Sequence, residues 1–385
     1  MRINKKKFFV RMFILISVIG LLIYARFLSV NDGWNDIITY YEGLISSLKE
    51  NKSTYLIAEK TFSVPTDKTL KNTIIGRNDG VVVVNNNGLK EYNISTEPYW
   101  TLDFYFANPL LAVANNWTAI AELNGTKIKV FDLKNEIYNL ELEGQIQKIV
   151  LNEKGYLGII YNKVGYKNAF AFVGPDGQIL YTKYFANTTL VDISINNDGN
   201  IISMIEADAN SAVINSAITY LDDKGNTLYS SIKKDKLLVE TKIFDNQTVV
   251  LGDNVLLNIN NNYEENMLEE FDNENIFGVV IEDEKIVKMY RDTNELFSDK
   301  TMIEIKKIDG KVIGNGEVTG TAKSLKVQGK TIAVVLADRI DFLTTKGNYM
   351  DSIFISSDYI DMKLFKNGSY ACIQTNDEIA IYKIR

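Results

Sequence analysis

Few side chains in this sequence are of the types that carry out catalysis or hold metal ions. The 385-residue chain has no histidine and one cysteine, Cys372. It therefore lacks the groups for an intrachain disulfide, a Cys/His zinc site and a histidine-activated nucleophile. Cys372 lies in an apolar run, and we expect it to be buried in a strand. We predict no metal, no cofactor and no enzymatic activity.

Three polar motifs resemble ligand-binding loops but are better explained as turns. Residues 196–200 read Asn-Asn-Asp-Gly-Asn, without the alternating acidic ligands and the closing glutamate of a calcium-binding EF-hand. Asp222 and Asp223 open a Lys-Gly-Asn turn, which is a common place for acidic side chains. The glycines of residues 314–316 precede no helix, which argues against a dinucleotide-binding loop. A pair of facing loop carboxylates could still perform acid–base catalysis on a glycan, although the sequence does not identify such a pair.

The N-terminal 30 residues predict a membrane anchor, because they contain six basic residues and no acidic ones. Residues 8–30 are predominantly apolar. Their charge-free centre, Met12–Ala25, would span about 21 Å as a helix, less than a bilayer core of about 30 Å. Arg11 and Arg26 can extend the span, because long basic side chains reach the lipid headgroups. We predict a transmembrane signal anchor at residues 8–30.

The charge distribution predicts the orientation of this anchor in the cell membrane. Residues 1–7 form a basic cytoplasmic tip, and the positive-inside rule then places the chain after residue 30 on the extracytoplasmic side. The alternative is a cleaved secretory signal, but no small-x-small cleavage site follows the apolar run. Beyond residue 30 the net charge is about −13, which disfavours nucleic-acid binding.

Residues 31–53 predict an amphipathic helical stalk. Their apolar side chains recur at offsets that place them on one face of a helix: Trp34, Ile37, Ile38, Tyr41, Leu44, Ile45 and Leu48. This face could dock on the rest of the protein, lie at the membrane surface or join two copies of the chain. Two heptads are too few to define a coiled coil, so we favour docking.

Residues 54–385 predict a repeated all-β architecture. Short apolar or β-branched runs alternate with turns rich in Gly, Asn and Asp, and the runs group in fours. One residue in the third strand of each group marks the repeat: Leu89, Ile128, Phe170, Ile218, Leu256, Ile303, Ile340 and Ile379. The markers recur about every 41 residues, which predicts a β-propeller of eight four-stranded blades, with seven blades as the alternative. A β-sandwich offers too few strands for this number of repeats.

The last group of strands is one strand short, because only three strands follow residue 359. An unpaired edge there would promote aggregation. The run Thr54–Val64 precedes the first complete group and can supply the missing outer strand. We predict that it pairs with Ile379–Ile384 and closes the ring.

A family resemblance is carried by the Lys5-Lys6-Lys7 tip, by the span after it and by hairpin motifs such as residues 175–181 and 223–229. The chain resembles an uncharacterised family of single-pass, extracytoplasmic propeller-like proteins of low-GC Gram-positive bacteria. It is more distantly similar to quinone-type and WD40-like propellers. Tyr181 and Tyr229 stand where quinone-type repeats have tryptophan, and Trp-Asp dipeptides are absent, so the resemblance implies no cofactor.

The longest connections predict where a partner binds. In a propeller, the loops between second and third strands and those between successive blades emerge on one face. Four aromatic residues of these loops, which could instead pack beneath them, are of the types that dominate recognition hot spots: Tyr105, Phe106, Tyr166 and Phe297. We predict a membrane-anchored, extracytoplasmic scaffold that binds an envelope protein or a glycan. A glycan hydrolase or lyase, or a small-ligand sensor, is the alternative.

Overall fold

The computed structural model describes residues 57–66, 72–77, 79–94, 97–210, 213–245, 247–271, 275–291 and 300–385. The chain divides into two compact units, residues 1–55 and residues 56–385. The predicted anchor at 8–30 and stalk at 31–53 lie outside the described residues. Within the described ranges, no helix is long and apolar enough to cross a membrane.

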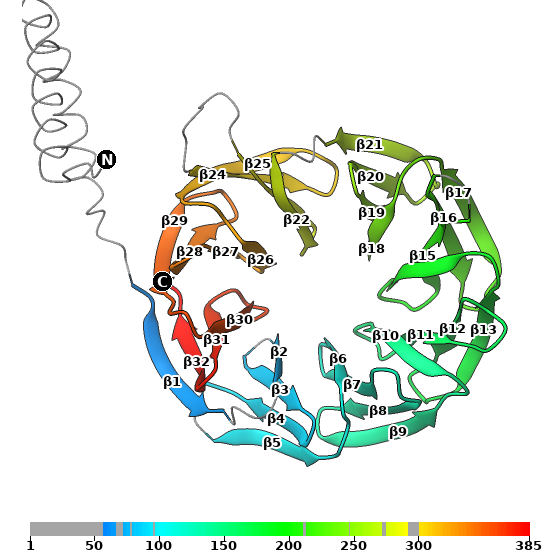
Figure 1. Cartoon of the computed structure of the whole chain (residues 1–385), viewed down its shortest axis with the longest axis horizontal. Helices are drawn as coiled ribbons and strands as arrows, with labels where there is room; N and C mark the ends of the chain where they lie inside the picture. The colour runs from blue at the N-terminus through cyan, green and yellow to red at the C-terminus, as the bar shows by residue number, and fades with distance from the viewer. Residues whose placement is uncertain are drawn as a thin grey trace, which may run out of the picture. The chain divides into compact units, whose positions relative to one another are not determined.

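The second unit is a ring of eight antiparallel sheets, each with four strands (Figure 1). Blade 1 contains β2 (Thr73–Gly76), β3 (Val81–Asn85), β4 (Gly88–Tyr92) and β5 (Pro98–Asp103). Blade 2 contains β6 (Pro109–Ala114), β7 (Trp117–Glu122), β8 (Lys127–Asp132) and β9 (Asn135–Glu141). Blade 3 contains β10 (Gln145–Leu151), β11 (Leu157–Asn162), β12 (Asn168–Val173) and β13 (Ile179–Phe185). Blade 4 contains β14 (Thr189–Ile195), β15 (Ile201–Asp208), β16 (Asn215–Asp222) and β17 (Thr227–Lys233).

The remaining four blades complete the ring. Blade 5 contains β18 (Leu238–Phe244), β19 (Gln247–Gly252), β20 (Val255–Asn260) and β21 (Glu265–Glu270). Blade 6 contains β22 (Ile276–Glu282), β23 (Lys285–Tyr290), β24 (Lys300–Lys307) and β25 (Val312–Thr319). Blade 7 contains β26 (Ser324–Gln328), β27 (Thr331–Val335), β28 (Arg339–Thr344) and β29 (Tyr349–Phe354). Blade 8 contains β30 (Tyr359–Leu364), β31 (Tyr370–Thr375), β32 (Glu378–Lys383) and β1 (Glu59–Pro65).

The observed blades confirm the predicted fold and exclude the seven-bladed alternative. The eight marker residues of the sequence repeat, from Leu89 to Ile379, all lie in the third strand of their blades. Each blade is a meander from an inner strand near the axis to an outer strand at the rim (Figure 1). In all eight blades, the pairing of the third and outer strands contains a register shift. Such irregularities increase local twist and bend the rim strand.

The middle strands are apolar on both faces because each blade packs between two neighbours. Strand β12 is buried along its whole length. Its Ala169 and Ala171 join a core cluster with Val130 of blade 2, whereas Phe170 and Phe172 join a cluster with residues of blade 4. Because alternate side chains of a strand point to opposite faces, a strand in this position must be apolar at every residue.

Ring closure follows the prediction, since the outer strand of the last blade comes from the N-terminal side of the body. Strand β1 pairs antiparallel with β32, with Glu59 opposite Lys383 and Pro65 opposite Glu378. Just before β1, Ile57 forms a parallel bridge with Ser352 on the rim strand of blade 7, and the Ala58 N–H donates to the Ser352 carbonyl at 3.0 Å. The described β1 begins at Glu59, five residues after the predicted start at Thr54.

Contacts between glycine and a neighbouring blade also hold the ring together. In blades 2 to 4, tyrosines of the outer strands cover turn glycines of the next blade: a Cβ on Gly177 would lie 2.6 Å from the Tyr138 ring, and one on Gly225 would lie 2.9 Å from the Tyr181 ring. Between blades 6 and 7, the backbones meet directly instead. A Cβ on Gly314 would lie 2.6 Å from the Lys346 backbone. The glycines of residues 314–316 thus permit close packing of two blades.

Candidate functional site

The two faces of the ring carry different connections. Connections between second and third strands and between successive blades share one face, here called the upper face, because the strands of each blade alternate in direction. The predicted partner-binding residues all belong to connections on this face. Phe297 lies outside the described residues, so the structure positions three of the four.

Tyr105 and Phe106, which are adjacent in sequence, have opposite environments. The Tyr105 side chain is 75% exposed on the connection between blades 1 and 2. The Phe106 side chain is 5% exposed and joins the core between these blades, with its ring centroid 5.0 Å from that of Phe104. The Phe106 N–H donates to the Asn86 carbonyl at 3.0 Å, which pins the connection to the turn of blade 1. Phe106 therefore packs beneath its own loop and presents no surface to a partner.

Tyr166 lies on an ordered loop of blade 3. Its ring stacks on that of Tyr184 with 4.9 Å between centroids, and it remains 44% exposed. The Tyr184 hydroxyl donates to Glu143 Oε1 at 3.3 Å, and the Lys163 ammonium forms an ion pair with the same carboxylate. The Lys167 N–H donates to the Phe185 carbonyl at 2.8 Å. These contacts fix the tyrosine pair on the rigid end of the blade.

Apolar side chains next to Tyr166 extend this surface onto blade 4. Val164 is 96% exposed at the tip of the blade 3 loop. The corresponding loop of blade 4 contributes exposed apolar residues and is joined to the blade 3 loop by the Lys167 ammonium, which donates to Asn210 Oδ1 at 3.2 Å. We define the blade 3–4 surface as Val164, Tyr166, Tyr184, Val213, Ile214 and Ile232. Sequence reasoning found only Tyr166 of this set, although an apolar residue beside Gly165 in a polar loop is a detectable signal.

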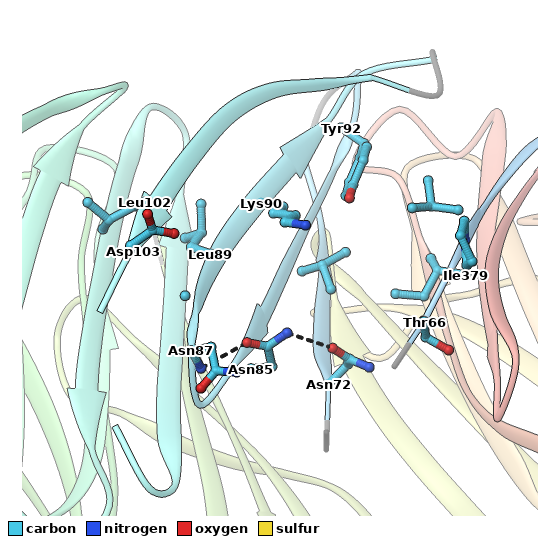
Figure 2. A pocket seen from close by; sticks show the side chains of 14 residues that line it. Thr66, Asn72, Asn85, Asn87, Leu89, Lys90, Tyr92, Leu102, Asp103 and Ile379 are labelled. Carbon is cyan, nitrogen blue, oxygen red and sulfur yellow. Dashed lines mark hydrogen bonds between the residues drawn. The ribbon is translucent and has the colours of Figure 1, made fainter. Parts of the chain in front are cut away.

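A pocket opens at the seam where β1 closes the ring. It has a volume of about 420 Å³ and lies between blade 8 and blade 1 (Figure 2). Its lining comprises Val64, Pro65, Thr66, Asn72, Val83, Asn85, Asn87, Gly88, Leu89, Lys90, Tyr92, Leu102, Asp103 and Ile379. A row of asparagines borders one end: Asn85 Nδ2 donates to Asn72 Oδ1 at 3.2 Å, and the Asn87 N–H donates to Asn85 Oδ1 at 2.9 Å (Figure 2). Burial raises the pKa of the Tyr92 hydroxyl in the pocket wall.

The polar motifs singled out in the sequence form turns, as predicted. Asp222 Oδ1 accepts the N–H groups of Lys224 at 2.9 Å and Asn226 at 2.8 Å, and the hydrogen bond from the Asn226 side chain lowers the pKa of this carboxyl group. Asn196 Oδ1 accepts the Asn200 N–H at 3.0 Å in the same way. Within the described ranges, no group of three or more His, Cys, Asp and Glu side chains is placed to hold a metal ion. Cys372 is fully buried, and burial raises the pKa of its thiol.

Carboxylates on the inner strands are held by lysines. The Lys148 ammonium lies 2.5 Å from Asp192 Oδ1, across the inner strands of blades 3 and 4. The Lys242 ammonium lies 2.5 Å from Glu282 and 3.4 Å from Glu240. Burial raises the pKa of Glu240, and the Lys242 charge opposes that shift. Acid–base chemistry on a glycan, the alternative raised by the sequence, would have its best candidate acid at Glu240.

These features define an eight-bladed β-propeller with an elaborated upper face. The chain belongs to the family of unknown function DUF5711, whose sequence profile matches residues 50–384. A search of curated proteins found no match to the sequence.

Solved propellers share this fold at low sequence identity. Sqt1 of Chaetomium thermophilum, solved bound to the N-terminus of the ribosomal protein L10, gives a TM-score of 0.58 at 8% identity and covers 85% of this chain and 100% of its own. BamB from Moraxella catarrhalis gives 0.53 at 12% identity over 85% of this chain and 98% of its own. The C-terminal WD40 domain of Sif2 gives 0.52 at 13% identity over 86% and 97%. The predicted distant similarity to quinone-type and WD40-like propellers is therefore confirmed at the level of the fold.

Proposed function

We propose that the protein is a membrane-anchored scaffold that holds an envelope protein on its upper face, outside the cytoplasmic membrane. The observation that carries this proposal is the blade 3–4 surface, where six exposed apolar side chains project from adjoining loops on rigid blades. Contiguous apolar side chains at loop tips favour burial against a partner, at about 1.5–3 kcal/mol for each large side chain. The peptide-bound structure of the similar propeller Sqt1 supports a protein ligand.

Replacing Tyr166 by Ala together with Val164 by Asp should abolish partner capture. Tyrosine at the centre of an interface contributes about 2 kcal/mol or more, which corresponds to about 30-fold in affinity. The aspartate adds the cost of placing a charge against an apolar partner. We expect a photo-crosslinking residue at position 105 to yield a discrete adduct in membranes of the unaltered protein and none in the double variant. Thermal unfolding should be unchanged, because both side chains are exposed.

Leu133 provides the matched control for this experiment. It is 44% exposed, as is Tyr166, but lies between the third and outer strands of blade 2 and therefore on the opposite face. Leu133→Asp should leave the adduct intact. An adduct that survives the double variant, or one lost equally in Leu133→Asp, would contradict a binding role for the blade 3–4 surface.

The anchoring part of the proposal has its own test. A reporter that is active only outside the cytoplasm, fused after Arg385, should be active, because the basic residues before Met12 are expected to stay inside. Mass spectrometry of the mature protein should recover peptides from residues 1–11. A mature N-terminus near Phe27 would show that the segment is a cleaved signal, and an inactive reporter would place the body in the cytoplasm.

A further inference from the structure

The pocket at the closing seam combines polar side chains that have no protein partner with a buried apolar wall. In the described part of the chain, the side chains of Asn87, Lys90 and Asp103 form no hydrogen bond or ion pair. Most other lysines near a carboxylate in the body are ion-paired, as Lys60 is with Glu378 at 2.5 Å on the same blade seam. The pocket therefore offers one cation, one anion and an amide that are available to a ligand.

The apolar wall of the pocket is part of the core between blades 8 and 1. Val83, Tyr92 and Ile379 are buried members of one core cluster, and Val64 packs against them from β1. Figure 2 shows Lys90 and Tyr92 on the same strand with their polar ends directed toward the space between the blades. Because these residues belong to paired strands, the wall is preorganised and a ligand need not order it.

The chemistry of the lining selects the class of ligand. The charges of Lys90 and Asp103 cancel, so the pocket has no net attraction for an anion or a cation. Three asparagine amides, the Thr66 hydroxyl and the Tyr92 hydroxyl supply donors and acceptors in comparable numbers. A ligand that matches this set is neutral, carries many hydroxyl groups and has a small apolar face. The volume of about 420 Å³ is within the range of small-molecule sites.

We propose that this pocket is a carbohydrate-binding site that accepts one or two neutral sugar rings. The asparagines and Asp103 bind ring hydroxyls, Lys90 donates to a ring or hydroxyl oxygen, and the C–H face of the sugar lies on Val64, Val83 and Tyr92. The site is distinct from the blade 3–4 surface and does not depend on the proposed protein partner. A sugar bound here would contact β1 and β32 as well as blade 1, and would therefore stabilise the closed ring.

The test uses the detergent-solubilised full chain with glucose, maltose, N-acetylglucosamine and the zwitterionic dipeptide glycylglycine as probes. Ligand-observed NMR titration should give saturable binding of at least one sugar, with a matching rise in the melting temperature. Asp103→Ala should weaken that binding about tenfold or more, because the lost hydrogen bond involves a charged group, and Asn87→Ala should weaken it several-fold.

Asn262→Ala is the matched control, because Asn262 occupies an equivalent turn: its N–H donates to Asn260 Oδ1 at 2.9 Å, as that of Asn87 does to Asn85 Oδ1. This variant should bind the sugar as the unaltered protein does. The proposal is overturned if none of the three sugars binds saturably, if glycylglycine binds and the sugars do not, or if Asp103→Ala and Asn87→Ala leave the affinity unchanged. Loss of crosslinking from position 105 has no bearing on these outcomes.

Discussion

Deletion of residues 59–65 is expected to abolish cooperative folding of the propeller. The deletion removes β1, whose partner strand β32 would then have a free edge. It also uncovers the core cluster between blades 8 and 1, in which Phe62 and Val64 pack against Tyr92 and Ile381. Each buried side chain contributes about 1.5–3 kcal/mol, and each lost hydrogen bond about 1 kcal/mol. The sum is comparable to the whole stability of a typical domain, about 5–15 kcal/mol.

Urea denaturation followed by tryptophan fluorescence and size-exclusion chromatography would measure this effect. A chain that lacks residues 1–50 is the control, because it retains β1 and the bridge from Ile57 to Ser352. The control should unfold in one cooperative transition and elute as a compact species. An unchanged transition after removal of 59–65 would show that β1 is not required to close the ring.

The second large effect is expected for Gly347→Ala. Gly347 has φ of 89° and belongs to the turn of blade 7 that contacts the outer strand of blade 6. A Cβ there would lie 1.9 Å from the Asn315 carbonyl oxygen, so the two blades must move apart. Backbone strain of about 1–2 kcal/mol and overpacking of about 1–3 kcal/mol should combine to lower the free energy of unfolding by about 3 kcal/mol.

Gly165→Ala separates the two causes of this loss. Gly165 also has φ of 89°, but its Cβ would have no heavy atom within 4 Å. This variant should therefore show the backbone strain alone, about 1–2 kcal/mol. Equal losses in urea denaturation of the two variants would mean that contact between blades 6 and 7 is not the reason for glycine at position 347.

The fold could be predicted from the sequence because its signals are local. Strands such as β12 show apolar runs bounded by turn residues, and the repeat repeats those signals in order. The closing strand could be predicted by counting strands, since the last group lacked one. The glycines at 314 and 316 were recognisable as unsuited to nucleotide binding, but their packing partner is a turn of the next blade, about 30 residues later, and no local pattern reports it.

The candidate sites were less predictable, because they depend on contacts between distant segments. Tyr105 and Phe106 share a loop and an aromatic character, and what buries Phe106 is its contact with the turn at Asn86. Exposure of Val164 likewise follows from the way its loop projects beyond the blade. The pocket draws its wall from Val64, from β4 and from Ile379. Residues so far apart in sequence carry no shared pattern that would mark them as neighbours.

The origin of the closing strand has a consequence for how the protein is made. Lys60 and Glu378, which form an ion pair across the closure, are separated by 318 residues. During synthesis and export, β1 is the first strand of the body to appear and must wait unpaired until the last strands follow. Pairings of such sequence separation form slowly, and unpaired strands aggregate or are cleaved. The nascent chain therefore needs shielding until its final strands emerge, and a chain that stops early is left open and open to degradation.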